Sequence, residues 1–193
     1  MMEIDKKALN RWKKSQISYL NYVIFISRKK EKFKLTLIDL LYVSNFKGGY
    51  ATINEPEVVI EQKLEHYGTL FQKINVKFQD KLLCDLEESE LSELIAYAHR
   101  LLNLTDHKSE TKIDGFSVSF LTTLLHFYFP NLFPILDRRV LNGLQLISNN
   151  DLNSQGQVKN LKDFYGSLIS AFRLRSKNKT IRELDKELFV RKF

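Results

Sequence analysis

Apolar residues recur at intervals of three and four along most of this chain, a spacing that is typical of helices with one buried face. The pattern is clearest over residues 57–74, where Asn54 is a suitable N-cap and Pro56 suits the first turn. Evidence for strands is confined to residues 75–78, a segment too short to form a sheet. We therefore expect an all-α fold of about eight helices. The other predicted helices cover residues 8–27, 35–43, 86–104, 116–129, 138–147, 161–175 and 181–189.

The composition excludes several classes of protein. The 193 residues are 44% hydrophobic and 27% charged, which is typical of one globular domain. Cys84 is the only cysteine, so the sequence supports neither a disulfide framework nor a cysteine-rich zinc site, and we expect a cytoplasmic protein without a metal. No apolar stretch reaches the ~20 residues that a membrane-spanning helix needs. No P-loop or dinucleotide-binding glycine run is present, so no cofactor is expected.

Charge is segregated along the chain. Residues 1–34 carry ten basic and three acidic residues, residues 35–106 carry six and twelve, and residues 107–193 carry fourteen and eight. The sequence thus predicts a single domain with a basic helical N-terminal segment, an acidic helical layer and a basic helical layer. Such segregation suits a polyanion such as DNA if the basic residues converge in space, and otherwise it describes a solvated surface.

Residues 113–144 carry the strongest candidate chemistry. A turn at Gly115 enters an apolar helix, Pro130 and Pro134 follow that helix, and Asp137 opens the next one. Aspartate is a preferred N-cap because its carboxylate accepts hydrogen bonds from backbone N–H groups of the first turn. Capping alone would therefore account for Asp137.

This order of glycine hairpin, apolar helix, proline-bearing loop and aspartate resembles the HhH-GPD superfamily of base-excision DNA glycosylases, in particular its bacterial 8-oxoguanine-glycosylase-like members. Gly115 matches the first glycine of the family's L-P-G-V-G-x-K hairpin, and Asp137 with Val140 matches its V-D-x-x-V segment. The resemblance is confined to residues 113–144. It implies a helix-hairpin-helix bundle, double-stranded DNA as the partner and Asp137 as the catalytic carboxylate.

Two hairpin positions depart from the family pattern. Ser117 stands where the family has its second glycine, and Ser119 stands where bifunctional members carry the lysine that forms a Schiff base. Because a serine hydroxyl cannot form an imine, the resemblance implies a monofunctional enzyme that hydrolyses the N-glycosidic bond of an extruded base. The alternative is a catalytically inactive DNA-binding or protein-interaction module of the same fold, in which Asp137 only caps its helix.

Contact with nucleic acid is expected at three places. The resemblance assigns the hairpin to the DNA backbone, and the arginines after Asp137 suit either phosphate contact or solvent. Residues 45–50 combine two glycines with a lysine and aromatic residues, which suits either a nucleic-acid strand or a plain turn. His126 lies among apolar residues, where we expect a hydrogen-bonded core histidine. The candidate contacts are Gly115, Ser117, Ser119, Arg138, Arg139 and Lys47.

Overall fold

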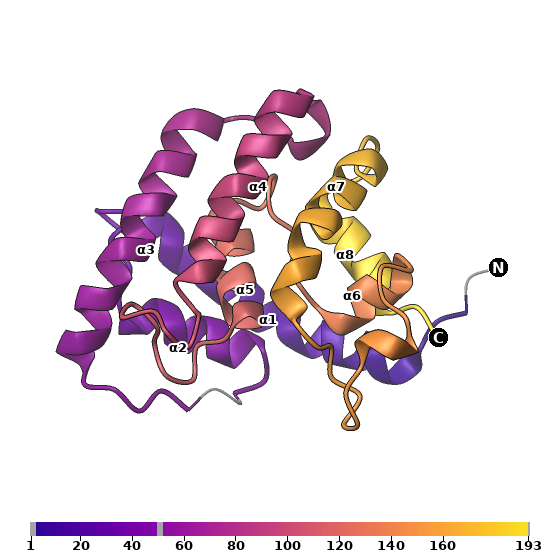
Figure 1. Cartoon of the computed structure of the whole chain (residues 1–193), viewed down its shortest axis with the longest axis horizontal. Coiled ribbons are helices and arrows are strands. Elements are labelled where there is room, and N and C mark those ends of the chain that lie inside the picture. Colours follow the sequence, from indigo (N-terminus) through magenta and orange to yellow (C-terminus); the bar gives the residue numbers. More distant parts are fainter. Residues whose placement is uncertain (1–2, 50–51, 193) are drawn as a thin grey trace.

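Eight α-helices and three short 3-10 helices make up the computed structural model, which describes residues 3–49 and 52–192 (Figure 1). Within these residues there is no strand, only two isolated bridges, and the predicted all-α class is confirmed. The α-helices are α1 (Lys6–Arg28), α2 (Leu37–Phe46), α3 (Glu57–Phe78), α4 (Glu88–Asn103), α5 (Val118–Tyr128), α6 (Arg138–Gly143), α7 (Tyr165–Arg175) and α8 (Ile181–Phe189). The 3-10 helices are Leu83–Asp85, Asn149–Asp151 and Leu161–Phe164.

The helix ends differ from the prediction for local reasons. α3 begins at Glu57, as predicted, but its N-cap residue is Pro56 rather than Asn54, and it continues over residues 75–78 because Phe78 extends the buried face of the helix. α6 is shorter than predicted, and the left-handed φ of 58° at Gln145 excludes a helix as far as residue 147. In the described part of the chain, no helix combines the length and the apolar character needed to cross a bilayer.

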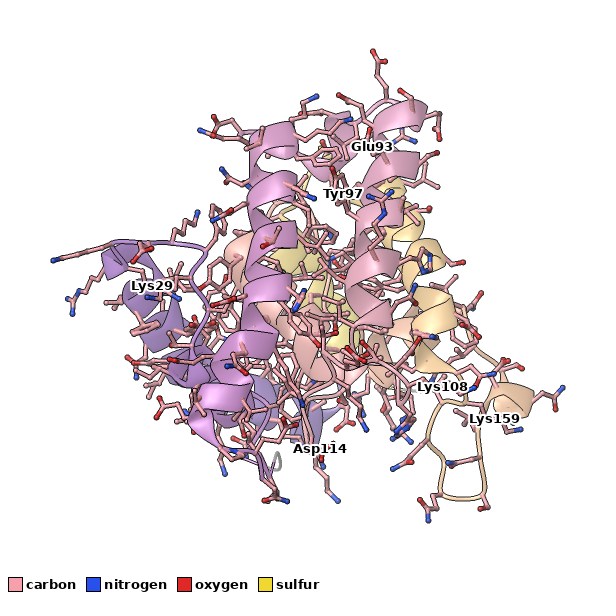
Figure 2. All side chains as sticks on the ribbon, turned by 60° about the vertical axis from the view of Figure 1, so that its left-hand side comes forward. Lys29, Glu93, Tyr97, Lys108, Asp114 and Lys159 are labelled. Carbon is pink, nitrogen blue, oxygen red and sulfur yellow. The ribbon has the colours of Figure 1, made fainter. Side chains whose placement is uncertain are left out.

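The helices form two groups that α1 connects and that also pack directly on each other through α4 and α7 (Figure 1). α3 and α4 stand side by side, and Figure 2 shows Glu93 and Tyr97 of α4 near their contact, where Glu93 pairs with Lys77 of α3. α6, α7 and α8 form the second group, while α1 contacts α2, α5 and α8. α5 lies in the centre, with every residue from Leu121 to Tyr128 buried. The first and last described segments are paired, because Asp5 donates its backbone N–H to the carbonyl of Val190 at 2.8 Å.

A buried carboxylate ties α1, α2 and α5 together. Asp39 of α2 is fully buried and accepts hydrogen bonds from the hydroxyls of Tyr22 (2.9 Å) and Tyr128 (2.8 Å) and from the ammonium of Lys29 (2.8 Å). It also closes a capping box at the start of α2 through the backbone N–H of Thr36. A buried charge with this many partners is compensated. The network fixes the direction of α2, and therefore where its C-terminal end lies.

Candidate active site

The loop before Asp137, residues 129–136, is fixed by hydrogen bonds to its carbonyl groups. Nδ1 of His126 in α5 donates to the carbonyl of Phe133 at 2.8 Å. The hydroxyl of Tyr165 in α7 donates to the carbonyl of Pro134 at 3.0 Å. Two separate helices therefore hold a segment that has no regular structure of its own. Rigid support of this kind keeps a catalytic group in one position.

The residue directly before Asp137 is held most closely. The backbone N–H of Leu136 donates to Oγ1 of Thr122 at 3.1 Å, and its carbonyl accepts from the hydroxyl of Ser119 at 3.3 Å. Both partners belong to α5, which is central and buried. The position of the aspartate thus follows from the packed core rather than from an exposed turn. Ser119, which we predicted as a DNA contact, acts here on the polypeptide backbone.

His126 is a core residue, as its sequence surroundings indicate. Its side chain is fully buried, and burial lowers the pKa of the imidazole from 6.5 to about 4, an effect that the charge of Arg182 reinforces. The hydrogen bond to Phe133 opposes this shift but does not outweigh burial. Among the described residues, Nε2 has no hydrogen-bond partner. A neutral imidazole that holds the loop before Asp137 is consistent with these observations.

Asp137 caps α6 and also faces a cation. Its carboxylate accepts the backbone N–H of Arg139 at 2.8 Å, and Oδ2 lies 3.7 Å from the ammonium nitrogen of Lys47. The side chains are 26% and 18% exposed respectively, so both line a surface that is only partly open to water. The capping interpretation of Asp137 is therefore correct, and it is compatible with a second role at the open side of the carboxylate.

Lys47 reaches this position because α2 ends in a tight turn. The backbone N–H of Lys47 donates to the carbonyl of Val43 at 3.0 Å, and that of Gly49 donates to the carbonyl of Ser44 at 2.8 Å. Gly48 and Gly49 both have positive φ, at 97° and 77°, which glycine adopts without strain. The predicted turn is thus present and carries Lys47 toward Asp137. Tyr50, the last residue of the predicted loop, lies outside the described residues.

Asp137 and Lys47 line a pocket of about 670 Å³, within the usual size range for a small-ligand site. Its walls come from α1, the end of α2, the start of α6 and α8. Arg11 and Lys14 of α1 line the same pocket, so part of the basic N-terminal segment shares a surface with Asp137. The charged lining residues are Arg11, Lys14, Lys47, Arg138, Arg139, Arg182, Asp137 and Asp185. This local excess of positive charge favours an anionic ligand.

Two charged residues of α8 also line the pocket, and the sequence pattern did not identify them as site residues. The guanidinium of Arg182 lies 3.8 Å from the ring centre of Trp12 and 4.4 Å from that of Tyr19. Its Nη1 donates to Oδ2 of Asp185 at 3.2 Å. A sequence signal for Asp185 does exist, because it lies on the same helix face as the buried Ile181 and Leu188, where an apolar residue is expected.

Burial is the main influence on Asp185. Its side chain is only 4% exposed, and burial raises its pKa from 3.8 to about 7. The negative charge of Asp137 raises this pKa further, whereas the positive charges of Arg182 and Lys47 lower it. At neutral pH the Asp185 carboxyl group is therefore protonated in a substantial fraction of the protein molecules. Asp137 and Asp185 face the same pocket in different environments.

The two arginines after Asp137 have different surroundings. Arg139 donates from Nε to the carbonyl of Phe189 at 2.7 Å, and from Nη2 to Asp5 at 2.8 Å and to the carbonyl of Arg191 at 2.9 Å. It therefore joins both ends of the chain to α6. Arg138 is exposed, and its Nη1 donates to the carbonyl of Gly156. Of the two side chains, that of Arg138 is the more accessible to a ligand.

The other hairpin residues lie outside the pocket. Gly115 has a φ of 80°, and a Cβ atom there would collide with the carbonyl of Thr52, so close backbone packing accounts for the glycine. Ser117 is the exposed N-cap residue of α5, and no cap hydrogen bond from its side chain is present. Figure 2 shows Asp114, beside Gly115, at the edge of the molecule. The fold thus brings together Asp137, Lys47 and the two arginines, and it separates Gly115 and Ser117 from them.

Comparisons of the chain with protein-family models, with curated proteins and with solved structures found no match. Within residues 3–49 and 52–192, no group of three or more His, Cys, Asp or Glu side chains is arranged to hold a metal ion. An aspartate in a cation-lined pocket can stabilise a positive charge on a ligand while nearby Lys and Arg residues bind phosphate.

Proposed function

We propose that this protein is a DNA base-excision glycosylase that hydrolyses the N-glycosidic bond of an extruded base, with Asp137 as the catalytic carboxylate. The observation that carries the proposal is the position of Asp137 in a pocket that is lined by six lysine and arginine residues, two of them from α1. A solvated charge pattern would not require that convergence. The proposal also includes the helix-hairpin-helix arrangement that residues 113–144 resemble, double-stranded DNA as the partner and a cytoplasmic location.

Base release requires that the nucleotide leave the duplex and that the charge on the sugar be stabilised. The glycosidic bond is shielded within the base stack, so the nucleotide must leave the duplex before the bond can break. As the bond between C1′ and the base nitrogen breaks, positive charge develops on the sugar, and the Asp137 carboxylate stabilises that charge. Water then bonds to C1′ and releases a proton. The hydrogen bonds between α5 and Leu136 hold Asp137 in place, so its carboxylate needs little reorganisation to reach the transition state.

Phosphate groups flanking the extruded nucleotide would contact the lysine and arginine residues that line the pocket. Arg138 is an exposed arginine of the lining, and the exposed Arg11 and Lys14 come from the wall formed by α1. Arginine binds phosphate oxygens with two parallel N–H groups, which fixes orientation as well as providing charge. Gly115 and Ser117 precede the N-terminus of α5, whose free N–H groups suit a second contact with the DNA backbone.

Water, rather than Lys47, is assigned as the nucleophile. Ser119 occupies the family's lysine position, but the fold brings Lys47 into the pocket from α2. The Lys47 ammonium is paired with Asp137 and has no lone pair with which to attack a sugar. We therefore expect no covalent adduct after borohydride treatment of a reaction mixture. A trapped adduct that disappears in Lys47→Gln would instead assign a lyase activity to Lys47.

The proposal is tested with duplexes that each carry a single 8-oxoguanine, uracil, hypoxanthine or mismatched adenine. We expect base release from at least one duplex by the natural protein, detected as strand cleavage after alkali, and loss of that release in Asp137→Asn. Asp106→Asn is the matched control, because Asp106 pairs with Lys162 at 2.7 Å outside the pocket. Salt-sensitive DNA binding without base release from any duplex would favour the inactive DNA-binding module.

A further inference from the structure

We propose that Asp185 of α8 is a second catalytic carboxyl group in this pocket, the general acid that protonates the departing base. This inference rests on the proposed glycosylase function and adds the proton donor that such a reaction requires. A nucleobase leaves more readily when its developing negative charge is neutralised by a proton as the bond to C1′ breaks. Asp137, which stabilises the sugar, cannot supply that proton while it acts as a carboxylate.

The placement of Asp185 carries the inference. It lines the same pocket as Asp137 but comes from α8 rather than from the start of α6. Two carboxyl groups from separate elements thus face one cavity, as in enzymes that hydrolyse glycosidic bonds. An acid on a helix face otherwise occupied by buried apolar residues costs stability, so a purely structural role does not readily explain the aspartate.

Asp185 is paired less completely than a buried carboxylate usually is. Its ion-pair partner, Arg182, donates to it from Nη1 at 3.2 Å. The Nε and Nη2 atoms of Arg182 are buried without a hydrogen-bond partner among the described residues. The guanidinium therefore does not donate two parallel N–H groups to the carboxylate. That arrangement would stabilise the charged form of the carboxylate. The stack on Trp12 and Tyr19 restricts the guanidinium instead.

The charges around Asp185 leave its proton available near neutral pH. Arg182 from the same helix and Lys47 from the end of α2 lower its pKa, and Asp137 from the start of α6 raises it. Burial outweighs these influences and brings the pKa of Asp185 to about 7. Asp137, in contrast, accepts one hydrogen bond from the Arg139 backbone N–H and faces the Lys47 ammonium. One pocket thus holds a carboxyl group suited to donate a proton and another suited to stabilise positive charge.

The proposed step balances with water as the only co-reactant. The bond from C1′ to the base nitrogen breaks, its electron pair stays with the base, and the Asp185 proton moves to the base. The oxygen of water bonds to C1′, and the water proton passes through Asp137 to solvent. Asp185 then regains a proton from solvent. The products are a neutral free base, which carries the new N–H, and an abasic sugar that carries a hydroxyl group at C1′.

The test is the pH dependence of base release under single-turnover conditions, measured for the natural protein, Asp185→Asn, Asp185→Glu and Glu187→Gln. Glu187 is the matched control, because it lies on the same helix, pairs with Lys179 and does not line the pocket. We expect the rate of the natural protein and of Glu187→Gln to fall as pH rises above about 7. Asp185→Asn should be slower by about 100-fold and lack this fall, since general-acid catalysis is worth that order of rate.

Each outcome bears on the proposal. If Asp185→Asn does not fold, Asp185→Glu replaces it, and the proposal then requires a retained fall in rate with a shifted midpoint. Loss of base release in Asp137→Asn with an unchanged rate and pH profile in Asp185→Asn would overturn this inference alone. No base release from any duplex by the natural protein would overturn the glycosylase function as well. Independently of activity, an Asp185 carboxyl carbon that titrates near pH 4 in the NMR spectrum would contradict the proposal.

Discussion

The Lys47 ammonium lies 3.7 Å from the Asp137 carboxylate, although the two residues belong to the ends of different helices. Lys47 is the C-cap residue of α2, and Asp137 is the N-cap residue of α6. A cation is favoured at a helix C-terminus and an anion at a helix N-terminus, because the peptide dipoles leave partial charges there. Each charge is therefore stabilised by its own helix as well as by its partner. The pair lines the pocket to which α1 also contributes basic residues.

Removal of the lysine charge should weaken DNA binding. Lys47→Gln is expected to lower the affinity for duplex DNA and to reduce the slope of log affinity against log salt by about 0.9, the value of one phosphate contact. Fluorescence anisotropy titrations at several salt concentrations measure both quantities. Lys108→Gln is the control, because Figure 2 shows Lys108 on an exposed segment and it does not line the pocket. Equal losses of DNA affinity in the two variants would show that Lys47 does not contact the DNA.

The two adjacent arginines should separate binding from stability. Arg139→Ala is expected to lower the free energy of unfolding by about 2 to 3 kcal/mol, because its hydrogen bonds to Asp5, Phe189 and Arg191 are lost. Arg138→Ala should change it by no more than about 0.5 kcal/mol, since this side chain is exposed, while it weakens DNA binding. Urea unfolding and anisotropy on the same preparations test both expectations. A stable Arg139→Ala variant would contradict the structural role assigned to this side chain.

Gly115 should be required for the fold. Gly115→Ala is expected to cost about 3 kcal/mol or more, because the added Cβ meets the carbonyl of Thr52 in addition to the strain of a positive φ. Gly49→Ala is the matched control, since Gly49 also has a positive φ of 77° but an added Cβ would have no atom within 4 Å. That variant should lose only about 1 kcal/mol. Equal losses in thermal or urea unfolding would show that close packing against Thr52 is not the reason for the glycine.

Stability should depend on pH through Asp185. The folded protein holds the Asp185 proton between the ordinary pKa of 3.8 and about 7, whereas the unfolded chain has released it, so this contribution to stability falls as pH rises through that interval. The free energy of unfolding of the natural protein, minus that of Asp185→Asn, should therefore decline by a few kcal/mol from the acid to the neutral limit. His126 acts in the opposite sense, because its depressed pKa of about 4 makes stability fall as pH decreases, and the subtraction cancels it. A difference that is constant with pH would contradict the raised pKa of Asp185.

Periodicity predicts most of this fold because each long helix buries one face. The pattern over residues 181–189 coincides with α8, and the pattern over 57–74 gives all of α3 except its last turn. The errors arise where one residue or a short segment decides the backbone. Gln145 takes a left-handed φ and so limits α6, and the predicted helix 161–175 begins as a 3-10 helix before α7. Such local choices depend on packing that a single sequence does not display.

The site is partly predictable, and the division has a physical cause. Asp137 and Lys47 follow turn signals that are readable along the chain, so both are recognisable as candidates. Their pairing is not predictable, because it depends on the direction that Asp39 imposes on α2. Predicting Asp185 as a site residue would have required knowing which elements pack on α8. The sequence does show one signal, an acid at an otherwise apolar position of that helix. Of the hairpin residues, Gly115 matches the family pattern and Ser117 departs from it, and both lie outside the pocket.

We propose that the Asp137 carboxylate acts on a ligand in addition to capping α6. Asparagine caps a helix as well as aspartate does, so Asp137→Asn keeps the fold while removing the charge. The most direct measurement is the single-turnover rate of base release from a duplex that the natural protein cleaves, with DNA affinity measured in parallel. We predict a rate at least about 100-fold lower in Asp137→Asn with DNA affinity retained. Release at the rate of the natural protein would contradict the account.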